Sequence, residues 1–263
     1  MLSGIVLLSK EEERKTFSFK CYQRMVSELL RALKFLNSAN VIHRDLKPDN
    51  FTIDATGKLT LLDFGIARVM NENSQMTSGA GTKYYWAIET IDFNNVQSER
   101  RNETTSDMWS IGATLCEMLT GKILFEDEKN SVLKAIEICG GPFPESILKE
   151  INLESSRNRL RDRANAAKRI DFMQYFREQG RPWLRNEIVN DGTALVDFIN
   201  RTLTFDHRAR MTVNEALAHP FLASARVPHK EILANHTIPD VGELSREQYR
   251  ELIWNAIKAS PVR

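Results

Sequence analysis

The chain has 263 residues, of which 42% are hydrophobic and 27% are charged, and its formal net charge is +1. This is an ordinary composition for a soluble globular protein, long enough for one large domain or two small ones. The near balance of charge predicts neither a nucleic acid nor a membrane as partner, because such partners need a clustered excess of one sign.

The cysteines and the first residues of the chain indicate the cellular compartment of the protein. Cys21, Cys116 and Cys139 are too scattered for a metal site or a disulfide framework. They indicate a reducing compartment, where thiols serve as small core side chains. The apolar run at residues 5–8 is too short for a signal peptide, and no stretch reaches the roughly 20 apolar residues that cross a bilayer. A cytoplasmic location is therefore expected, with access to the nucleus left open.

Helical spacing of apolar residues dominates the chain. It predicts a helix over residues 17–36 and a fully buried one over 108–119, which is apolar on nearly every face. Further helices are expected at residues 132–138, 194–203 and 213–218. Between the first two helices, residues 50–53 and 58–62 read as short strands joined by a turn at 54–57. The expected fold class is mainly α, with one small β-ribbon that carries the loops described next.

Residues 154–170 are strongly basic, with arginine or lysine at six positions. A nucleic-acid patch and a solvated helix face both fit this composition. The solvated face is favoured, because Glu154, Asp162 and Asp171 are interspersed and no aromatic residues interleave.

The most informative string is His-Arg-Asp-Leu-Lys-Pro-Asp-Asn at residues 43–50, followed by Asp-Phe-Gly at 63–65. Phosphoryl transfer needs a carboxylate for the attacking hydroxyl, a cation on the moving phosphoryl group and oxygen ligands for magnesium. In this pattern Asp45 would deprotonate the hydroxyl and Lys47 would balance charge on the phosphoryl group. Asn50 and Asp63 would hold the metal that bridges the phosphates. Alone, each residue would more often serve a turn, but the joint spacing favours a site.

These residues resemble the protein kinase superfamily, and the resemblance extends downstream. Residues 85–89, Tyr-Trp-Ala-Ile-Glu, look like the Tyr-Arg-Ala-Pro-Glu end of the family's activation segment. Residues 106–112 look like the start of its central helix, where Asp107 would tie down the catalytic-loop backbone. Arg210 stands where the family places the buried partner of Glu89, although two unrelated surface charges are the alternative. Lys47, Asn50 and Asp63 would then contact ATP with Mg²⁺.

Later segments resemble the mitogen-activated protein kinases. Residues 121–125, Gly-Lys-Ile-Leu-Phe, fit that branch, and so does an insert at about 142–195. Residues 244–254 are similar to the helix of its C-terminal extension. The resemblance implies a kinase C-lobe over residues 1–222 and a C-terminal extension with a terminal helix over 223–263.

Departures from that branch concern regulation and partners. The activation-loop Thr-x-Tyr reads Thr77-Ser78-Gly79, and an arginine that the family uses near the phosphotyrosine is Trp86. Thr77 stays a candidate site for an upstream kinase, with Arg44 and Arg68 to pair with its phosphate, and an ordinary loop threonine is the alternative. Thr82 lies in the expected substrate-docking loop, for Ser/Thr targets followed by proline. The family's acidic docking patch reads Val-Pro-His-Lys-Glu at 227–231, so basic docking peptides should bind poorly.

The 263 residues contain neither the glycine-rich loop nor the Val-Ala-Ile-Lys strand of a complete kinase. Two interpretations follow. In the first, the chain is a truncated Ser/Thr protein kinase of the mitogen-activated type that lacks its N-lobe and is inactive alone. In the second, it is a non-catalytic half-kinase that acts as an interaction module. The intact Asp45, Lys47, Asn50 and Asp63 favour the first for the family function.

Overall fold

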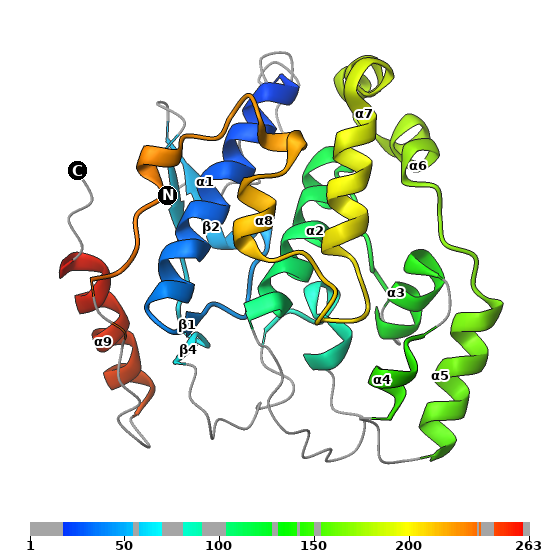
Figure 1. Cartoon of the computed structure of the whole chain (residues 1–263), viewed down its shortest axis with the longest axis horizontal. Helices are drawn as coiled ribbons and strands as arrows, with labels where there is room; N and C mark the ends of the chain where they lie inside the picture. Colours follow the sequence, from blue (N-terminus) through cyan, green and yellow to red (C-terminus); the bar gives the residue numbers. More distant parts are fainter. Residues whose placement is uncertain are drawn as a thin grey trace. The chain divides into compact units, whose positions relative to one another are not determined.

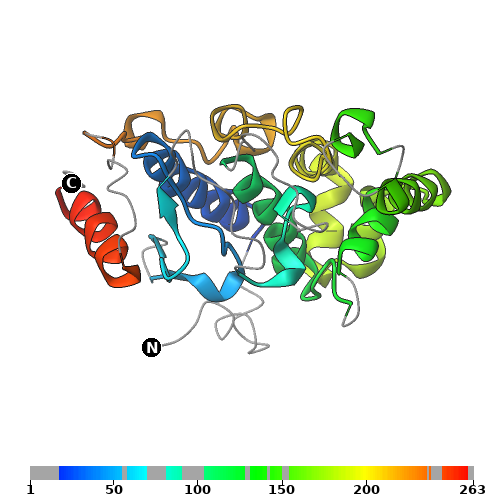
Figure 2. The ribbon, with the colours of Figure 1, turned by 90° about the horizontal axis from the view of Figure 1, so that it is seen from below.

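The computed structural model describes residues 18–54, 58–69, 81–90, 104–127, 131–140, 143–149, 154–235, 237 and 245–259. By their internal contacts the residues divide into two compact units, 1–74 with 212–263 and 75–211, and each is described by itself. The described part is rich in helix and has few strands (Figures 1 and 2). None of its helices combines the length and hydrophobicity that a membrane crossing requires.

The first unit is built on helix α1, Phe19–Ser38, which was expected at 17–36. Its apolar side chains recur three and four residues apart, and Leu29, Leu30 and Leu33 are at most 3% exposed. This face packs against α8, Val213–Leu217, and the 3₁₀ turn η6, Pro220–Leu222. The first unit therefore joins an early helix to a segment almost 200 residues later.

Two short antiparallel ribbons complete the first unit, where one was expected. Strand β2, Phe51–Ile53, pairs with β3, Leu59–Leu61, close to the predicted strands. Strand β1, Val41–Ile42, also pairs with β4, Arg68–Val69. The prediction missed this second ribbon because a strand of two residues is too short to show alternation.

The chain after α8 returns along α1. Helix α8 begins with a capping box in which Thr212 and Glu215 bond each other's backbone, so its start is well defined. Farther on, after the 3₁₀ turn η7, Pro228–Lys230, the Glu231 carboxylate accepts hydrogen bonds from Lys34 at 2.9 Å and from Arg226 at 2.7 Å. The terminal helix α9 spans Arg246–Ala259.

The Glu231 carboxylate should make stability depend on pH. The hydrogen bond from Arg226, together with Lys34, holds the pKa of Glu231 below its ordinary value. A lowered folded pKa stabilises the protein above the unfolded pKa, and this is lost as pH falls through the folded value. We expect Glu231→Gln to cost about 1 kcal/mol at pH 7 and nothing at pH 2. Urea unfolding across pH measures this, with the exposed Glu247→Gln as control. An equal loss at both pH values would contradict the prediction.

The second unit is centred on helix α2, Thr104–Thr120, which is buried on nearly every face as predicted. It crosses helix α7, Pro182–Thr202, at Gly112, where a Cβ atom would come within 2.5 Å of the Thr202 hydroxyl. Cys116 on α2 and Cys139 are buried, and burial raises the pKa of the Cys139 thiol to about 12. Burial likewise raises the pKa of Cys116, so both thiols act as core residues.

Four helices lie between α2 and α7. Helix α3, Ser131–Cys139, precedes the range of the expected insert, which contains α4, Glu145–Leu148, α5, Glu154–Ala166, and α6, Phe172–Gln179. Helix α6 was not predicted. Its N-cap is Asp171, whose carboxylate accepts the Met173 N–H at 2.8 Å. The basic helix α5 does not gather its arginines on one face: Arg161 pairs with Glu145, while Arg163 lies near Glu137 on the other flank.

Gly140, directly after α3, has a positive φ of 49°, and a Cβ atom there would stand 2.1 Å from the Arg169 amide nitrogen. We expect Gly140→Ala to lower the free energy of unfolding by about 3 kcal/mol, from left-handed strain and a backbone clash. Gly121 is the control: its φ is 77°, but its neighbour is the movable Arg181 guanidinium at 3.1 Å. Gly121→Ala should cost about 1 kcal/mol in the same thermal melts. Equal losses would contradict the assigned clash.

Candidate active site

The loop from β1 to β2 carries the first three candidate residues. Pro48–Asn50 forms a 3₁₀ turn, which places Asn50 directly before β2. Arg44 has a φ of 72° and Asp63 has a φ of 54°, both in the left-handed region. Such strained backbone persists only where the surrounding structure holds it, as at many functional sites.

The Asp45 carboxylate is nearly buried and has a defined orientation. Its Oδ2 accepts a hydrogen bond from the Asn50 amide nitrogen at 2.8 Å, and the Lys47 ammonium lies 3.1 Å away. The same Asn50 nitrogen donates to the Asp45 backbone carbonyl at 2.7 Å. Asn50 therefore closes the loop on Asp45, and the three predicted catalytic residues share one cluster.

His43 joins this loop to the segment of Asp63. It is fully buried, and its Nδ1 accepts the Asp45 N–H at 3.4 Å. Its Nε2 lies 2.9 Å from the Leu62 carbonyl oxygen, which requires the proton on Nε2. The ring also meets Phe64 edge-on, with centroids 5.1 Å apart. The role of His43 was not foreseen, although its place at the start of the motif was the available signal.

Asp63 is held next to Asn50 by the backbone. The Leu62 N–H donates to the Asn50 carbonyl at 2.7 Å, which continues the β2–β3 pairing. The Asp63 side chain is exposed, and its Oδ1 accepts the Gly65 N–H at 3.0 Å. Asp63 thus reaches the same end of the ribbon as the catalytic loop.

The donor set suits a hard divalent cation. Because the Asn50 nitrogen is engaged by Asp45, its amide oxygen is the atom left for a metal. Asp63 adds a carboxylate, and oxygen ligands are what Mg²⁺ prefers. Within the described residues no three His, Cys, Asp or Glu side chains cluster as a metal site. Asn50 and Asp63 are the two candidate Mg²⁺ ligands of this site, and phosphate oxygens of the substrate would complete the coordination.

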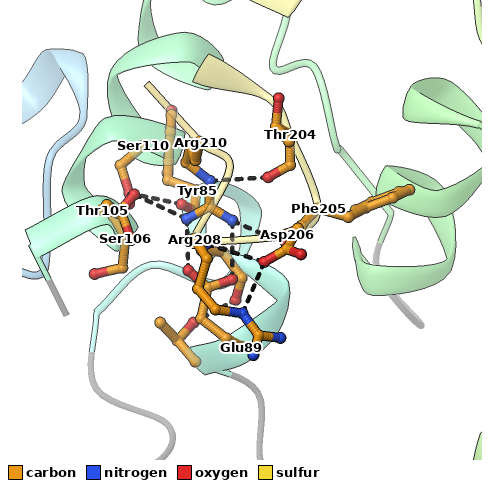
Figure 3. A network of polar contacts seen from close by, with 12 residues as sticks. Tyr85, Glu89, Thr105, Ser106, Ser110, Thr204, Phe205, Asp206, Arg208 and Arg210 are labelled. Atoms are coloured by element: carbon orange, nitrogen blue, oxygen red, sulfur yellow. Dashed lines mark hydrogen bonds and ion pairs between the residues drawn. The ribbon is translucent and has the colours of Figure 1, made fainter. Parts of the chain in front are cut away.

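The second unit contains the ion pair between Glu89 and Arg210, shown in Figure 3. The guanidinium forms two bonds to the carboxylate, at 2.5 and 3.0 Å, and both side chains are at most 4% exposed. Arg210 also donates to the carbonyls of Thr204 at 2.9 Å and Thr105 at 2.8 Å. It lies 5.2 Å from the Trp109 ring centre. The pair thus ties the turn η5, Ile88–Thr90, to α2 and to the loop after α7.

Further hydrogen bonds anchor the segment before Glu89. The Ser110 hydroxyl on α2 donates to the Tyr85 carbonyl at 2.8 Å, and the Tyr85 hydroxyl donates to Glu117. Thr82 precedes the 3₁₀ turn η4, Lys83–Tyr85, and its carbonyl accepts the Tyr85 N–H at 3.0 Å. Ser110 and Glu117 were missed, because a polar residue on a helix that reads as uniformly apolar looks incidental.

Asp206, in the same network, has a partner of its own. Burial alone would raise the pKa of Asp206, but hydrogen bonds from the Arg208 backbone and side chain hold it below the ordinary value. The Arg208 guanidinium lies 3.1 Å away and is half exposed (Figure 3). This partly exposed ion pair is separate from the buried pair of Glu89 and Arg210.

The remaining predicted residues are placed as follows. Asp107 is 1% exposed in the first turn of α2, and its predicted tie to the catalytic loop, which belongs to the other unit, stays a prediction. Arg44 is half-buried, and Arg68 pairs in register with Ile42. Thr77 and the loop insertion at 96–101 lie outside the described residues.

Comparison with known proteins identifies the family. A family model described as "Protein kinase domain" matches residues 2–222. The chain belongs to the protein kinase family. The curated proteins that it resembles include mitogen-activated protein kinases, and the chain is a protein kinase chain of the mitogen-activated type.

Three relatives illustrate the match. The kinase chain is 30% identical to "Mitogen-activated protein kinase pmk-3" of Caenorhabditis elegans over 262 residues, 97% of this chain and 52% of the relative. It is 30% identical to "Mitogen-activated protein kinase HOG1" of Wallemia muriae, covering 96% of this chain and 83% of the relative. It is 34% identical to "Extracellular signal-regulated kinase 1" of Dictyostelium discoideum, covering 90% of this chain and 42% of the relative. The chain spans about half the length of the first curated relatives it matches, 52% to 57%.

Proposed function

We propose that this chain supplies the catalytic and metal-binding loops of a Ser/Thr protein kinase of the mitogen-activated type, which transfers the ATP γ-phosphate to protein hydroxyls. One observation carries the proposal. The Asp45 carboxylate is held by Asn50 and Lys47 and is linked to the Asp63 segment through His43 and Leu62. These contacts fix the position of the carboxylate, as catalysis by positioning requires.

Each residue has a distinct task in the proposed reaction. Asn50 and Lys47 hold Oδ2 and so orient the Asp45 carboxylate, which would position the attacking hydroxyl and accept its proton. Lys47, 20% exposed, reaches toward solvent and would balance negative charge on the transferred group. Asn50 and Asp63 would hold Mg²⁺ against the phosphates, and Mg²⁺ would neutralise the charge that develops there.

The proposal includes a limit on what this chain does alone. A kinase holds ATP with a glycine-rich loop and a strand lysine, and the 263 residues contain neither. Because the catalysis is mostly positioning and electrostatics, we propose that the chain acts as the lower lobe and is inactive without the upper one. The second candidate function is a non-catalytic interaction module.

Regulation and partners belong to the proposal as well. Thr77 would be the single activation-loop site for an upstream kinase, since Gly79 replaces the family's tyrosine. Thr82 and the small Ala87 near it would dock Ser/Thr targets, with proline next to the acceptor. The one carboxylate in the docking segment, Glu231, is engaged by Arg226 and Lys34, which supports weak binding of basic docking peptides. A cytoplasmic location is proposed because the scattered cysteines indicate a reducing compartment, with access to the nucleus left open.

The transcript and an assay test the function together. Reading the full-length complementary DNA shows whether coding sequence upstream encodes a glycine-rich loop and a strand lysine. We expect that longest product to phosphorylate a generic basic-protein substrate with Mg²⁺ and ATP, and the 263-residue chain alone to give no signal. If the longest product has no such elements and phosphorylates nothing, the kinase proposal is wrong and the interaction module stands.

A further inference from the structure

A strip of positive charge runs along α1. Lys20, Arg24, Arg31 and Lys34 are separated by four, seven and three residues, which places them on one face of the helix. The strip is about 21 Å long, from the rise of 1.5 Å per residue. The only carboxylate on α1 is Glu28, which forms an ion pair with Arg31. Lys20 and Arg24 are exposed at the start of the strip.

The chain after α8 lies beside this strip and adds to its charge. Three hydrogen bonds hold it against α1: the Ser224 hydroxyl to the Gln23 side-chain Oε1 at 2.9 Å, Lys34 to Glu231 at 2.9 Å, and the Ala234 N–H to the Ser38 hydroxyl at 2.8 Å. Figures 1 and 2 show the orange segment alongside blue α1.

The combined surface, α1 with residues 221–235, carries six Lys or Arg residues and two carboxylates, an excess of four positive charges. Since the whole chain has a net charge of +1, the residues outside this surface together carry a net charge of −3. Both carboxylates are bonded to cations. Glu231 is 5% exposed, and Glu28 at 19% is more exposed than its partner Arg31 at 11%, so the exposed cations of this surface are Lys20, Arg24 and Lys230. In the described part of the chain, the side chains of Lys20 and Lys230 have no partner.

We propose that this surface binds an acidic linear segment of another protein, rich in Glu and Asp with one apolar anchor. Its charge is opposite to that of a docking patch for basic peptides. An extended segment of about six residues matches the strip in length, at roughly 3.3 Å per residue. Leu233 at the far end is 53% exposed and offers the apolar contact. The described aromatic residues of α1 are not exposed, so bases would have nothing to stack on, which favours a peptide over nucleic acid.

The proposal depends on the proposed function only for what the bound segment does, as substrate or regulator. Binding needs no phosphoryl transfer, so its failure would leave the kinase proposal intact. The probe is a fluorescein-labelled twelve-residue peptide with six glutamates and two leucines, titrated with the 263-residue chain at physiological salt. Its counterpart carries lysine at the six glutamate positions.

The variant Lys20→Glu/Arg24→Glu/Lys230→Glu should weaken binding of the glutamate peptide at least about tenfold, because it reverses three exposed charges. The matched control, Arg157→Glu/Arg159→Glu/Lys168→Glu, makes the same charge change in the other unit and should leave affinity within about twofold. If the first variant does not fold, Leu233→Ser serves instead. It should weaken the leucine-containing peptide about fivefold and leave a serine-substituted peptide unchanged.

Three outcomes would overturn the proposal. In the first, the lysine peptide binds as tightly as the glutamate peptide. In the second, the control variant loses as much affinity for the glutamate peptide as the α1 variant does. The third is competition by a 20-base-pair DNA duplex or by phosphatidylserine vesicles at lower concentration than by unlabelled peptide, which would assign the surface to that polyanion.

Discussion

Replacing Arg210 with alanine should lower the free energy of unfolding by about 3–5 kcal/mol, the usual cost of breaking a buried ion pair from one side. The Glu89 carboxylate would stay buried without its cation, since its side chain is only 4% exposed. The carbonyls of Thr204 and Thr105 would lose their donor as well. Because domains are stable by about 5–15 kcal/mol, the variant should be close to unfolding. Urea titration followed by tryptophan fluorescence measures the loss.

Arg208 is the matched control for Arg210. It stands two residues away and also pairs with a carboxylate, but its side chain is 51% exposed. Arg208→Ala should therefore cost less than about 1 kcal/mol. The double variant Glu89→Leu/Arg210→Met should recover part of the loss, because no buried charge remains unpaired. Similar losses in Arg208→Ala and Arg210→Ala would show that burial does not set the cost.

Asp45→Asn should abolish most phosphoryl transfer in the product that carries both lobes, by about 100-fold to 10,000-fold in kcat. An amide cannot accept the hydroxyl proton as a carboxylate does, and it would place a second amide beside Asn50. The KM for ATP should change little, because the proposed metal ligands, Asn50 and Asp63, are unchanged. Steady-state kinetics with a peptide substrate separate the two constants.

Asp49→Asn is the control in the same turn. Asp49 is exposed and neighbours Asn50 in the sequence. Asp49→Asn removes the same charge as Asp45→Asn but leaves the proposed proton acceptor in place. It should leave kcat within about twofold. Equal activity of Asp45→Asn and the parent protein would remove Asp45 from the mechanism.

Much of the candidate site could be predicted from the sequence. Asp45, Lys47 and Asn50 lie within six residues, so one tight turn brings them together. The β2–β3 ribbon could also be predicted, since its three-residue strands flank a turn with a typical turn sequence. The pairing of Glu89 with Arg210, 121 residues apart, came only from resemblance to a family. No periodicity in a single sequence encodes such a contact.

Other features had no local signal. The β1–β4 ribbon has two residues in each strand, and it pairs segments that lie on either side of β2 and β3 in the sequence. His43 gained its role through the Leu62 carbonyl, 19 residues away. Ser110 looked incidental on a helix buried all round, and its bond to the Tyr85 carbonyl depends on how α2 packs.

The sequence by itself determined the family, the catalytic string and the central helix, because each is set by residue types at short spacing. Only the tertiary structure decided how the Asp45 carboxylate is held, how Arg210 is buried, and that the segment after α8 seats on α1 through Glu231. Those outcomes depend on burial and on contacts between distant segments. The proposed catalytic residues Asp45, Lys47 and Asn50 therefore lie in one short turn, while the basic surface on α1 arises only when the chain has folded.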